Sequence, residues 1–129
     1  MQFPADLRYS KEHVWVRLEG AEAIVGITDH AQKELGDIVF VETPKPGAAL
    51  TRGKPFGVVE SVKSVSDLHA PLGGAVARVN EALASTPEIV NKDPYGAGWM
   101  IVLSPVDPSE VAGLMDAAAY ESYVREVAG

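Results

Sequence analysis

The stretch Val59-Glu60-Ser61-Val62-Lys63-Ser64-Val65 places one lysine between two segments that are typical of β-strands. Upstream, residues 55–59 are β-branched and aromatic; downstream, residues 65–70 run into Pro71-Leu72-Gly73-Gly74, which ends a strand. Between the strands there is no Asn-Gly or Asp-Gly pair, which a tight hairpin normally uses. The sequence therefore predicts a β-hairpin whose tip presents Lys63 at a position where residues that favour turn conformations are usual.

The chain is small and contains no cysteine. At 129 residues it is long enough to bury its own core, and we expect a single domain over residues 1–129. The lack of cysteine excludes a thiol nucleophile, a thiolate metal site and a disulfide, and it suits a reducing compartment. Any redox-active sulfur must therefore come from a cofactor.

The charge is acidic, with 11 basic and 18 acidic residues and a formal net charge of −7. Because the basic residues form no cluster, we expect neither nucleic acid nor an anionic membrane as a partner, and proteins with basic docking faces fit better. The N-terminus has no signal-peptide pattern, and no window has the length of a membrane span. We expect a cytoplasmic protein, or one of the mitochondrial matrix if the source is eukaryotic.

Glycine and proline punctuate the first three quarters of the chain at short intervals, which is typical of antiparallel strands. The strands are expected at residues 8–9, 13–19, 22–27, 37–42, 49–51, 55–61, 65–69, 74–79 and 99–103. Residues 37–41 are apolar on both faces, so we expect this strand in the interior of the sheet system.

Short helices are expected between some of these strands. Thr28 can cap a helix over residues 29–35, which Gly36 then ends. Further helical turns are expected at residues 80–83 and 86–90.

The C-terminal part predicts helices over about residues 107–127. Asp107-Pro108-Ser109-Glu110 supplies a cap, a proline at the first helical position and an acid three residues after the cap. The two apolar stripes that follow do not join at helical spacing, so we expect two short helices with a kink near Asp116.

A weak internal repeat links two β-motifs at an offset of about 30 residues. Val25-Gly26-Ile27 opens the first motif and Phe56-Gly57-Val58 opens the second. The repeat suggests a core hairpin motif over about residues 22–80 with a pseudo-twofold axis, in which Lys63 lies on the hairpin of the second half.

A lone lysine on a turn has four possible roles, the simplest of which is a solvated charge. A Schiff-base lysine needs a lowered pKa, whereas the nearby Glu60 and Asp67 favour the charged form. A phosphate-binding lysine follows a glycine-rich loop that opens a helix, and Gly57 alone does not make one. The fourth role is a modification site. There, an exposed amine at a rigid tip is acylated and carries a swinging cofactor arm.

Three separated motifs resemble the glycine cleavage system H proteins, and the match spans nearly the whole chain. In chain order they are Gly26-Ile27-Thr28-Asp29-His30-Ala31-Gln32 with Leu35-Gly36-Asp37, then Glu60-Ser61-Val62-Lys63-Ser64 with Pro71-Leu72-Gly73-Gly74, and then Pro94-Tyr95-Gly96-Ala97-Gly98-Trp99-Met100. The resemblance implies a mainly β fold, a flattened barrel-sandwich hybrid of two antiparallel sheets like that of lipoyl domains, with short flanking helices.

The resemblance also implies a lipoyl carrier that is not an enzyme, with lipoate in amide linkage on Lys63. Family members shuttle the aminomethyl group of glycine among a pyridoxal-phosphate glycine decarboxylase, a tetrahydrofolate-dependent aminomethyltransferase and an FAD-containing dihydrolipoamide dehydrogenase. A lipoate ligase or lipoyltransferase attaches the cofactor. This enzyme is expected to read the acid three residues before the lysine and the glycine eleven residues after it, which are Glu60 and Gly74 here.

A cleft that shelters the loaded, positively charged arm is a further implication, and a carboxylate in it would stabilise the ammonium charge. Asp67, Glu12 and His30 are the expected lining residues, with ordinary surface acids or a packed histidine as the alternatives. The usual His-Glu-Trp of the family reads His13-Val14-Trp15 here, so the customary acid is missing. Glu12 could replace it, although neighbouring strand positions face opposite ways.

Other readings stay open. A biotinyl carrier normally has methionines beside its lysine, where this chain has Val62 and Ser64. The lipoyl domain of a 2-oxo acid dehydrogenase is shorter and lacks the helical C-terminus. A non-carrier β-module derived from the family, with a binding or regulatory role, is the alternative from another class. His13 and His69 have no partner at metal-ligand spacing, and no nucleophile signature is present, so we expect neither a metal site nor catalytic residues.

Overall fold

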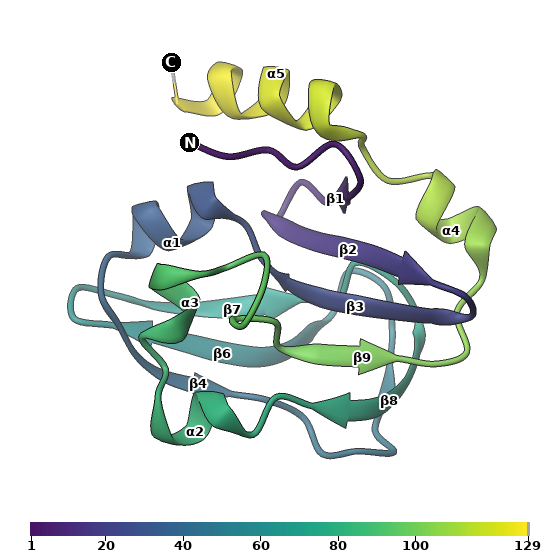
Figure 1. Ribbon diagram of the computed structural model, residues 1–129, viewed down its shortest axis with the longest axis horizontal. Coiled ribbons are helices and arrows are strands. Elements are labelled where there is room, and N and C mark those ends of the chain that lie inside the picture. Colours follow the sequence, from purple (N-terminus) through teal and green to yellow (C-terminus); the bar gives the residue numbers. More distant parts are fainter. Residues whose placement is uncertain (129) are drawn as a thin grey trace.

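Two antiparallel β-sheets pack against each other in the computed structural model, which describes residues 1–128 (Figure 1). The larger sheet has six strands in the order β1-β2-β3-β9-β8-β5, and the smaller one has three in the order β4-β6-β7. The strands are β1 Arg8–Tyr9, β2 Val14–Glu19, β3 Glu22–Ile27, β4 Ile38–Glu42, β5 Ala49–Leu50, β6 Pro55–Ser61, β7 Val65–His69, β8 Gly74–Val79 and β9 Ile101–Leu103. The predicted fold class, a mainly β fold of two antiparallel sheets, is confirmed.

The position predicted for residues 37–41 is wrong. β4 is an edge strand of the small sheet rather than an interior one, and Val39 and Phe40 are 53% and 46% exposed. A β-bulge between Ile38 and Phe40 shifts the register, so that Ile38 and Val41 face the core while the two residues between them do not. The continuous apolar run therefore reflects an apolar surface and not burial on both faces.

Within residues 1–128, five helices flank the sheets: α1 Asp29–Leu35, α2 Ala82–Ser85, α3 Ile89–Lys92, α4 Pro108–Ala112 and α5 Ala117–Ala128. Thr28 caps α1 by accepting a hydrogen bond from the Ala31 N–H at 3.2 Å, and Gly36 ends it at a φ of 80°. The predicted break in the C-terminal helical part is confirmed between α4 and α5. None of the helices in the described chain has the length and apolar character needed to cross a membrane.

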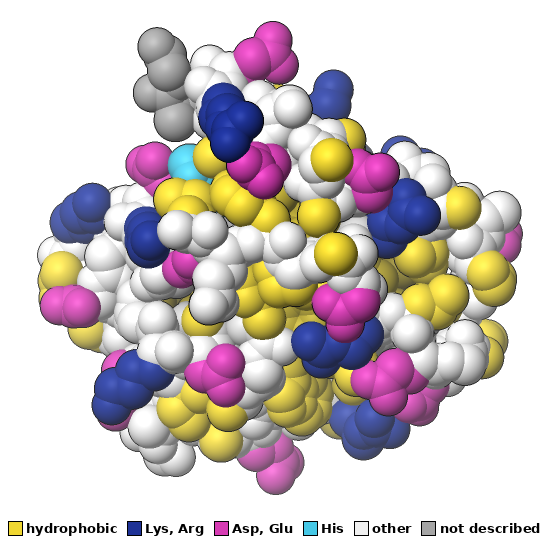
Figure 2. All heavy atoms as spheres, turned by 45° about the horizontal axis from the view of Figure 1, so that its top comes forward, with side chains coloured by type: hydrophobic (Ala, Val, Ile, Leu, Met, Phe, Trp, Pro, Cys, Tyr) yellow, Lys and Arg dark blue, Asp and Glu magenta, His cyan; other side chains and the backbone are white. Residues whose placement is uncertain are grey.

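Charged side chains of both signs are interspersed with apolar areas on the face drawn in Figure 2, which looks partly onto the end of the molecule that carries α5. Lys and Arg side chains lie there singly, next to Asp and Glu, and form no extended basic surface. This distribution matches the acidic composition of the chain.

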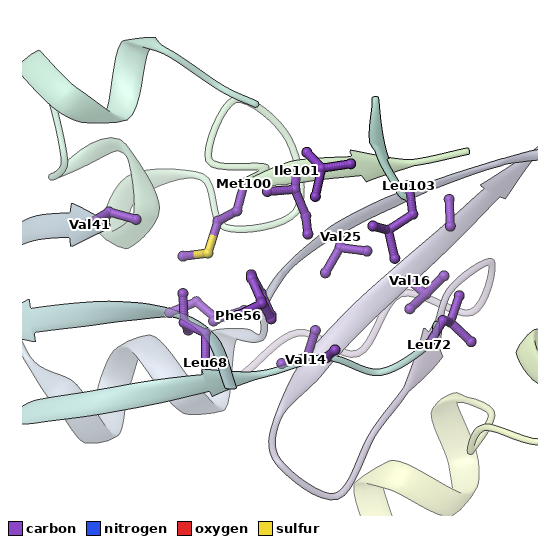
Figure 3. Packing of buried hydrophobic residues seen from close by; sticks show 14 of the residues in the cluster. Val14, Val16, Val25, Val41, Phe56, Leu68, Leu72, Met100, Ile101 and Leu103 are labelled. Atoms are coloured by element: carbon purple, nitrogen blue, oxygen red, sulfur yellow. The ribbon is translucent and has the colours of Figure 1, made fainter. Parts of the chain in front are cut away.

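The main core lies between the two sheets (Figure 3). Phe56 and Leu68 of the small sheet face Val25 of β3 and Met100 just before β9, and all four side chains are at most 8% exposed. Burying one such side chain contributes about 1.5–3 kcal/mol. This packing holds β6 and β7 against the larger sheet and sets the direction of the hairpin that joins them.

A second, largely aromatic cluster attaches α5 to the larger sheet. Tyr120 of α5 stacks on Tyr9 of β1 with ring centroids 4.5 Å apart, and both rings are fully buried. Nearby, Trp15 is fully buried and its indole N–H donates to the Pro94 carbonyl at 2.9 Å. Figure 1 shows the N-terminal segment lying between α5 and the rest of the molecule.

We expect Gly26→Ala to destabilise the fold, because a Cβ at this position would lie 2.8 Å from three atoms of the Trp15 indole, which the Pro94 hydrogen bond holds in place. Overpacking of this kind costs about 1–3 kcal/mol of unfolding free energy, which urea unfolding measures. Gly73→Ala is the matched control, because no atom lies closer than 3.6 Å to a Cβ there. Equal stability of the two variants would contradict the expectation.

Candidate functional site

Lys63 lies at the tip of the β6–β7 hairpin, as predicted, and a serine hydroxyl shapes the turn. The Ser61 N–H donates to the Ser64 carbonyl at 2.8 Å, and the Ser61 Oγ accepts from the N–H groups of Lys63 and Ser64 at 3.3 and 3.1 Å. None of these tip residues has a positive φ. The turn therefore needs no Asn-Gly pair, because the Ser61 side chain satisfies the backbone groups that such a pair would otherwise arrange.

The tip is also attached to the segment that follows α1. The Val62 N–H donates to the Asp37 carbonyl at 3.0 Å. The Asn91 side chain holds that segment in turn, accepting from the Ile38 N–H at 2.8 Å and donating to the Gly36 carbonyl at 2.9 Å. The base of the lysine side chain is thereby fixed relative to α1, α3 and β4.

The Lys63 side chain is exposed and its stem lies over Gly36, where an added Cβ would be 3.4 Å from the Lys63 Cε. Within residues 1–128, no carboxylate comes within 4.0 Å of its ammonium nitrogen. The amine can therefore be reached from solvent and does not need to leave an ion pair in order to react.

A cavity of about 340 Å³ opens near the lysine, between α1, the turn before β2, β7 and the end of α5. It begins at Leu35, the neighbour of Gly36, and includes Ser66, three residues after Lys63. The complete lining is Glu12, His13, His30, Ala31, Glu34, Leu35, Ser66 and Val127. The cavity thus combines two carboxylates with apolar walls, a setting that can hold a long apolar chain with a positively charged end.

Two of the three residues predicted for the arm cleft line this cavity and one does not. Glu12 and His30 both lie in its wall. Asp67 does not, because the β6–β7 register pairs Ser66 with the buried Val59 and pairs Asp67 with Val58. Successive strand residues face opposite sides, so Asp67 lies on the outer face of the small sheet.

The objection that Glu12 and His13 must point in opposite directions does not apply, because these residues precede the strand. β2 begins at Val14, and His13 has a φ of 66°, so its backbone is not extended. Glu12 and His13 therefore both reach the cavity. Val14, at the position of the customary acid, is 1% exposed and packs in the main core.

A polar network behind the cavity, which sequence reasoning missed, connects α5 to α1. The Tyr120 hydroxyl lies 2.8 Å from His13 Nδ1 and 2.7 Å from the Thr28 Oγ1. The His13 ring lies 4.6 Å from the His30 ring, whose Nε2 is 3.8 Å from Glu34. Burial, and then the neighbouring His30, lower the pKa of His13. Only the spacing of Glu34 from His30, four residues along one helix face, could have been read from the sequence.

Glu60 and Gly74, the two residues expected to guide cofactor attachment, lie near opposite ends of β7. Glu60 is near the tip, on β6 opposite Val65. Gly74 begins β8, beyond the other end of β7, a strand of five residues that spans about 17 Å. Gly74 has a φ of 148°, and a Cβ there would lie 3.4 Å from the Pro105 carbonyl. The positive φ and the nearby Pro105 carbonyl therefore explain why position 74 carries a glycine.

No group of three or more His, Asp or Glu side chains is positioned to hold a metal ion in the described part of the chain. The cavity also contains no nucleophile arranged with a base and an orienting acid. Its chemistry is that of a binding surface next to an exposed primary amine.

Comparison with known proteins gives a consistent family. The sequence pattern of the family described as "Glycine cleavage H-protein" matches residues 7–127. The glycine cleavage system H protein of Geobacillus kaustophilus is 56% identical over 126 residues, which are 98% of this chain and 99% of that protein. The one from Myxococcus xanthus is 53% identical over 122 residues, 95% of each chain. A crystal structure of a glycine cleavage system H protein from Mycobacterium marinum superposes with a TM-score of 0.84 at 37% identity, covering 98% of this chain and 99% of that one.

The lowered pKa of His13 predicts a pH dependence of stability. The folded state binds fewer protons at this site than the unfolded chain, whose histidines titrate near 6.5. The contribution of neutral His13 to the free energy of unfolding is therefore fully present above that pH, and it is lost as the pH falls below it. His13→Asn removes the titration and tolerates the positive φ. We expect its unfolding free energy to fall less than that of the wild type between about pH 7.5 and 5.5. Equal slopes in urea unfolding would refute this role.

Proposed function

We propose, since the chain belongs to the glycine cleavage H-protein family, that lipoate is attached in amide linkage to Lys63. The chain is a lipoyl carrier of the glycine cleavage system. The observation that carries the assignment to Lys63 is its exposed amine, which has no ion pair within the described residues and stands on a hairpin tip that hydrogen bonds hold in place.

The surroundings of Lys63 fit a long acyl chain. The lysine side chain and a lipoyl group together reach roughly 14 Å by ordinary bond lengths, long enough to enter a partner's buried site while the carrier stays outside. The same reach extends to the cavity beside Leu35 and Ser66. When bound, the cofactor supplies a dithiolane whose sulfurs accept the aminomethyl group, and the described chain contributes the fixed base of the arm.

We assign the cavity to the resting place of the loaded arm. Glu12 and Glu34 are the carboxylates in its wall. They take the place of the customary acid of the family, whose position is occupied by Val14 in this chain. His30 and Leu35 contribute part of the wall. An ammonium group placed between the two carboxylates would form charge-assisted hydrogen bonds, and this contact holds the arm against the protein.

The proposed partners follow from the glycine cleavage system. The carrier delivers its arm to a pyridoxal-phosphate glycine decarboxylase, a tetrahydrofolate-dependent aminomethyltransferase and an FAD-containing dihydrolipoamide dehydrogenase, and it performs none of their chemistry. A lipoate ligase or lipoyltransferase loads it. The relatives named above come from bacteria, and we propose that this chain works in the cytoplasm with these enzymes.

Intact-mass measurement after incubation with lipoate, ATP and a lipoate ligase tests the attachment site. We expect a mass gain of one lipoyl group in the wild type and none in Lys63→Ala, since the exposed amine is the acceptor. Lys54→Ala, which removes another exposed lysine, should still gain the group. An unmodified wild-type chain, or a gain that persists in Lys63→Ala, would sink the proposal.

Glu60 and Gly74 are expected to separate recognition from folding. Glu60→Ala should slow lipoylation several-fold and change the unfolding free energy by less than about 0.5 kcal/mol, because Glu60 is a partly exposed acid with no ion pair within residues 1–128. Gly74→Ala should cost about 1–3 kcal/mol of stability through its backbone conformation. Its folded fraction should also gain the lipoyl group more slowly than the wild type, because the attaching enzyme is expected to read this position as well. Rates of mass gain and urea unfolding, measured on both variants, decide the matter.

A further inference from the structure

A row of hydrogen bonds behind the cavity ends at the ring of His13. The Thr28 Oγ1 accepts from the Ala31 N–H at 3.2 Å and lies 2.7 Å from the Tyr120 hydroxyl. The same hydroxyl lies 2.8 Å from His13 Nδ1. Thr28 and Tyr120 are fully buried, so neither hydroxyl can find a partner in bulk water. The direction of these hydrogen bonds therefore decides which form of His13 the cavity contains.

The number of protons in this row fixes its direction. Within the described residues, the Tyr120 oxygen is the one group to which the Thr28 hydroxyl can donate. If Tyr120 donated to Thr28 instead, the buried Thr28 proton would have no acceptor, and an unsatisfied buried donor destabilises a fold. Thr28 therefore donates to Tyr120, and the Tyr120 O–H is left to donate to His13 Nδ1.

His13 is accordingly a neutral imidazole whose proton is on Nε2. A cationic ring would reverse both hydrogen bonds and leave the Thr28 proton without an acceptor. Burial, and then the neighbouring His30, also lower the pKa of His13, whereas Glu34 and Glu12 act in the opposite direction. The titratable groups around the ring come from three elements: His30 and Glu34 from α1, Glu12 from the turn before β2, and Tyr120 and Tyr123 from α5.

The Nε2–H of His13 is a hydrogen-bond donor without a partner inside the chain. None of the hydrogen bonds and ion pairs found within residues 1–128 involves this nitrogen. Nδ1 is directed to Tyr120, which is not part of the cavity lining, and His13 itself forms part of the cavity wall. Beside the carboxylates of Glu12 and Glu34, the cavity therefore offers one N–H donor to a ligand.

The length of α1 indicates which part of the arm this donor can meet. The Lys63 Cε lies beside Gly36, and the six positions from Gly36 to His30 span about 9 Å at 1.5 Å per residue. The His13 ring is next to the His30 ring, with centroids 4.6 Å apart. Beyond the Cε, a lipoyl group reaches its sulfurs after about eight bonds, roughly 10 Å, whereas its amide carbonyl is only about three bonds away. The sulfur end therefore has the length to reach His13, and the amide does not.

We propose that Tyr120 is a positioning residue for the cavity: its hydroxyl holds His13 in the neutral Nε2–H form, and this N–H donates to a sulfur of the docked arm while the two carboxylates hold the ammonium group. Sulfur accepts hydrogen bonds, weakly as a thiol or thioether and more strongly as a thiolate, whereas an ammonium group has donors alone. His13 and the carboxylates thus bind different atoms of the arm. This inference rests on the proposed attachment of lipoate to Lys63 and on the proposed resting place of the arm.

Nitrogen-15 NMR of the histidine rings tests the role of Tyr120 on the chain without lipoate, at about pH 8, where histidine is neutral. The chain has three histidines, and His13→Asn identifies the resonances of His13. In the wild type we expect a protonated Nε2 and an unprotonated Nδ1 that accepts a hydrogen bond. In Tyr120→Phe the Nδ1 resonance should move to the position of an unbonded ring nitrogen. Tyr123→Phe is the matched control on the same helix and should leave both resonances unchanged, because the Tyr123 hydroxyl donates to the Lys11 carbonyl.

The contact with the arm is tested on the lipoylated chain after incubation with glycine and glycine decarboxylase and separation from that enzyme. The His13 Nε2 resonance should shift on loading in the wild type and in Tyr123→Phe. Intact mass then follows the loss of the aminomethyl group to water. This loss should be about two- to tenfold faster in Tyr120→Phe than in the wild type or Tyr123→Phe, because the docked arm no longer has a fixed donor for one hydrogen bond.

Thermal unfolding shows whether Tyr120→Phe is folded, and if it is not, the wild-type spectra decide, since they need no variant. A wild-type His13 protonated on Nδ1, or an unchanged Nδ1 resonance in folded Tyr120→Phe, overturns the positioning role. An Nε2 resonance that does not respond to loading overturns the contact with the arm. A wild-type chain that accepts no lipoate overturns the proposed attachment site and the arm contact with it, whereas the spectra without lipoate still decide the hydrogen bonds of His13.

Discussion

The contact between the hairpin tip and the segment after α1 is the constraint on which the functional end of the molecule depends. The Val62 N–H donates to the Asp37 carbonyl, and the Asn91 side chain holds the backbone on both sides of Asp37. A two-residue tip on an isolated hairpin would be mobile. Here, the hydrogen bonds give Lys63 a fixed base, so that only the side chain beyond it moves. A carrier needs this combination, because a partner must find the base of the arm in one place while the end of the arm travels.

The same contact places the proposed attachment site next to the cavity. It brings the tip against Gly36, where α1 ends, and α1 supplies His30, Glu34 and Leu35 to the cavity wall. The stem of Lys63 lies over Gly36, which has no side chain to block the route from tip to cavity. The short helix α1 is thus capped by Thr28, and it both supports the tip and forms part of the cavity wall.

The two faces of the small sheet present different side chains beside the hairpin tip. The inner face buries Val59 and Leu68 in the core and presents Ser66 to the cavity, whereas the outer face presents Glu60 and Val65 to solvent. Because strand residues alternate, the cavity and the exposed outer face adjoin the same hairpin without sharing a side chain. The bulge in β4 extends the outer surface by directing apolar side chains outward.

The sequence by itself determined the elements and the position of the lysine, because periodicity, caps and turn residues act over a few neighbours. Strand limits such as Pro55–Ser61 and the Asp107 cap follow from such local rules. Only the tertiary structure decided that β4 is an edge strand, since a bulge depends on the partner strand. It likewise decided that Asp67 faces away from the cavity, whereas Glu12 and Glu34, 22 positions apart in sequence, both line it. The contact of Tyr120 with His13 joins residues more than a hundred positions apart, and such contacts arise only when the chain packs.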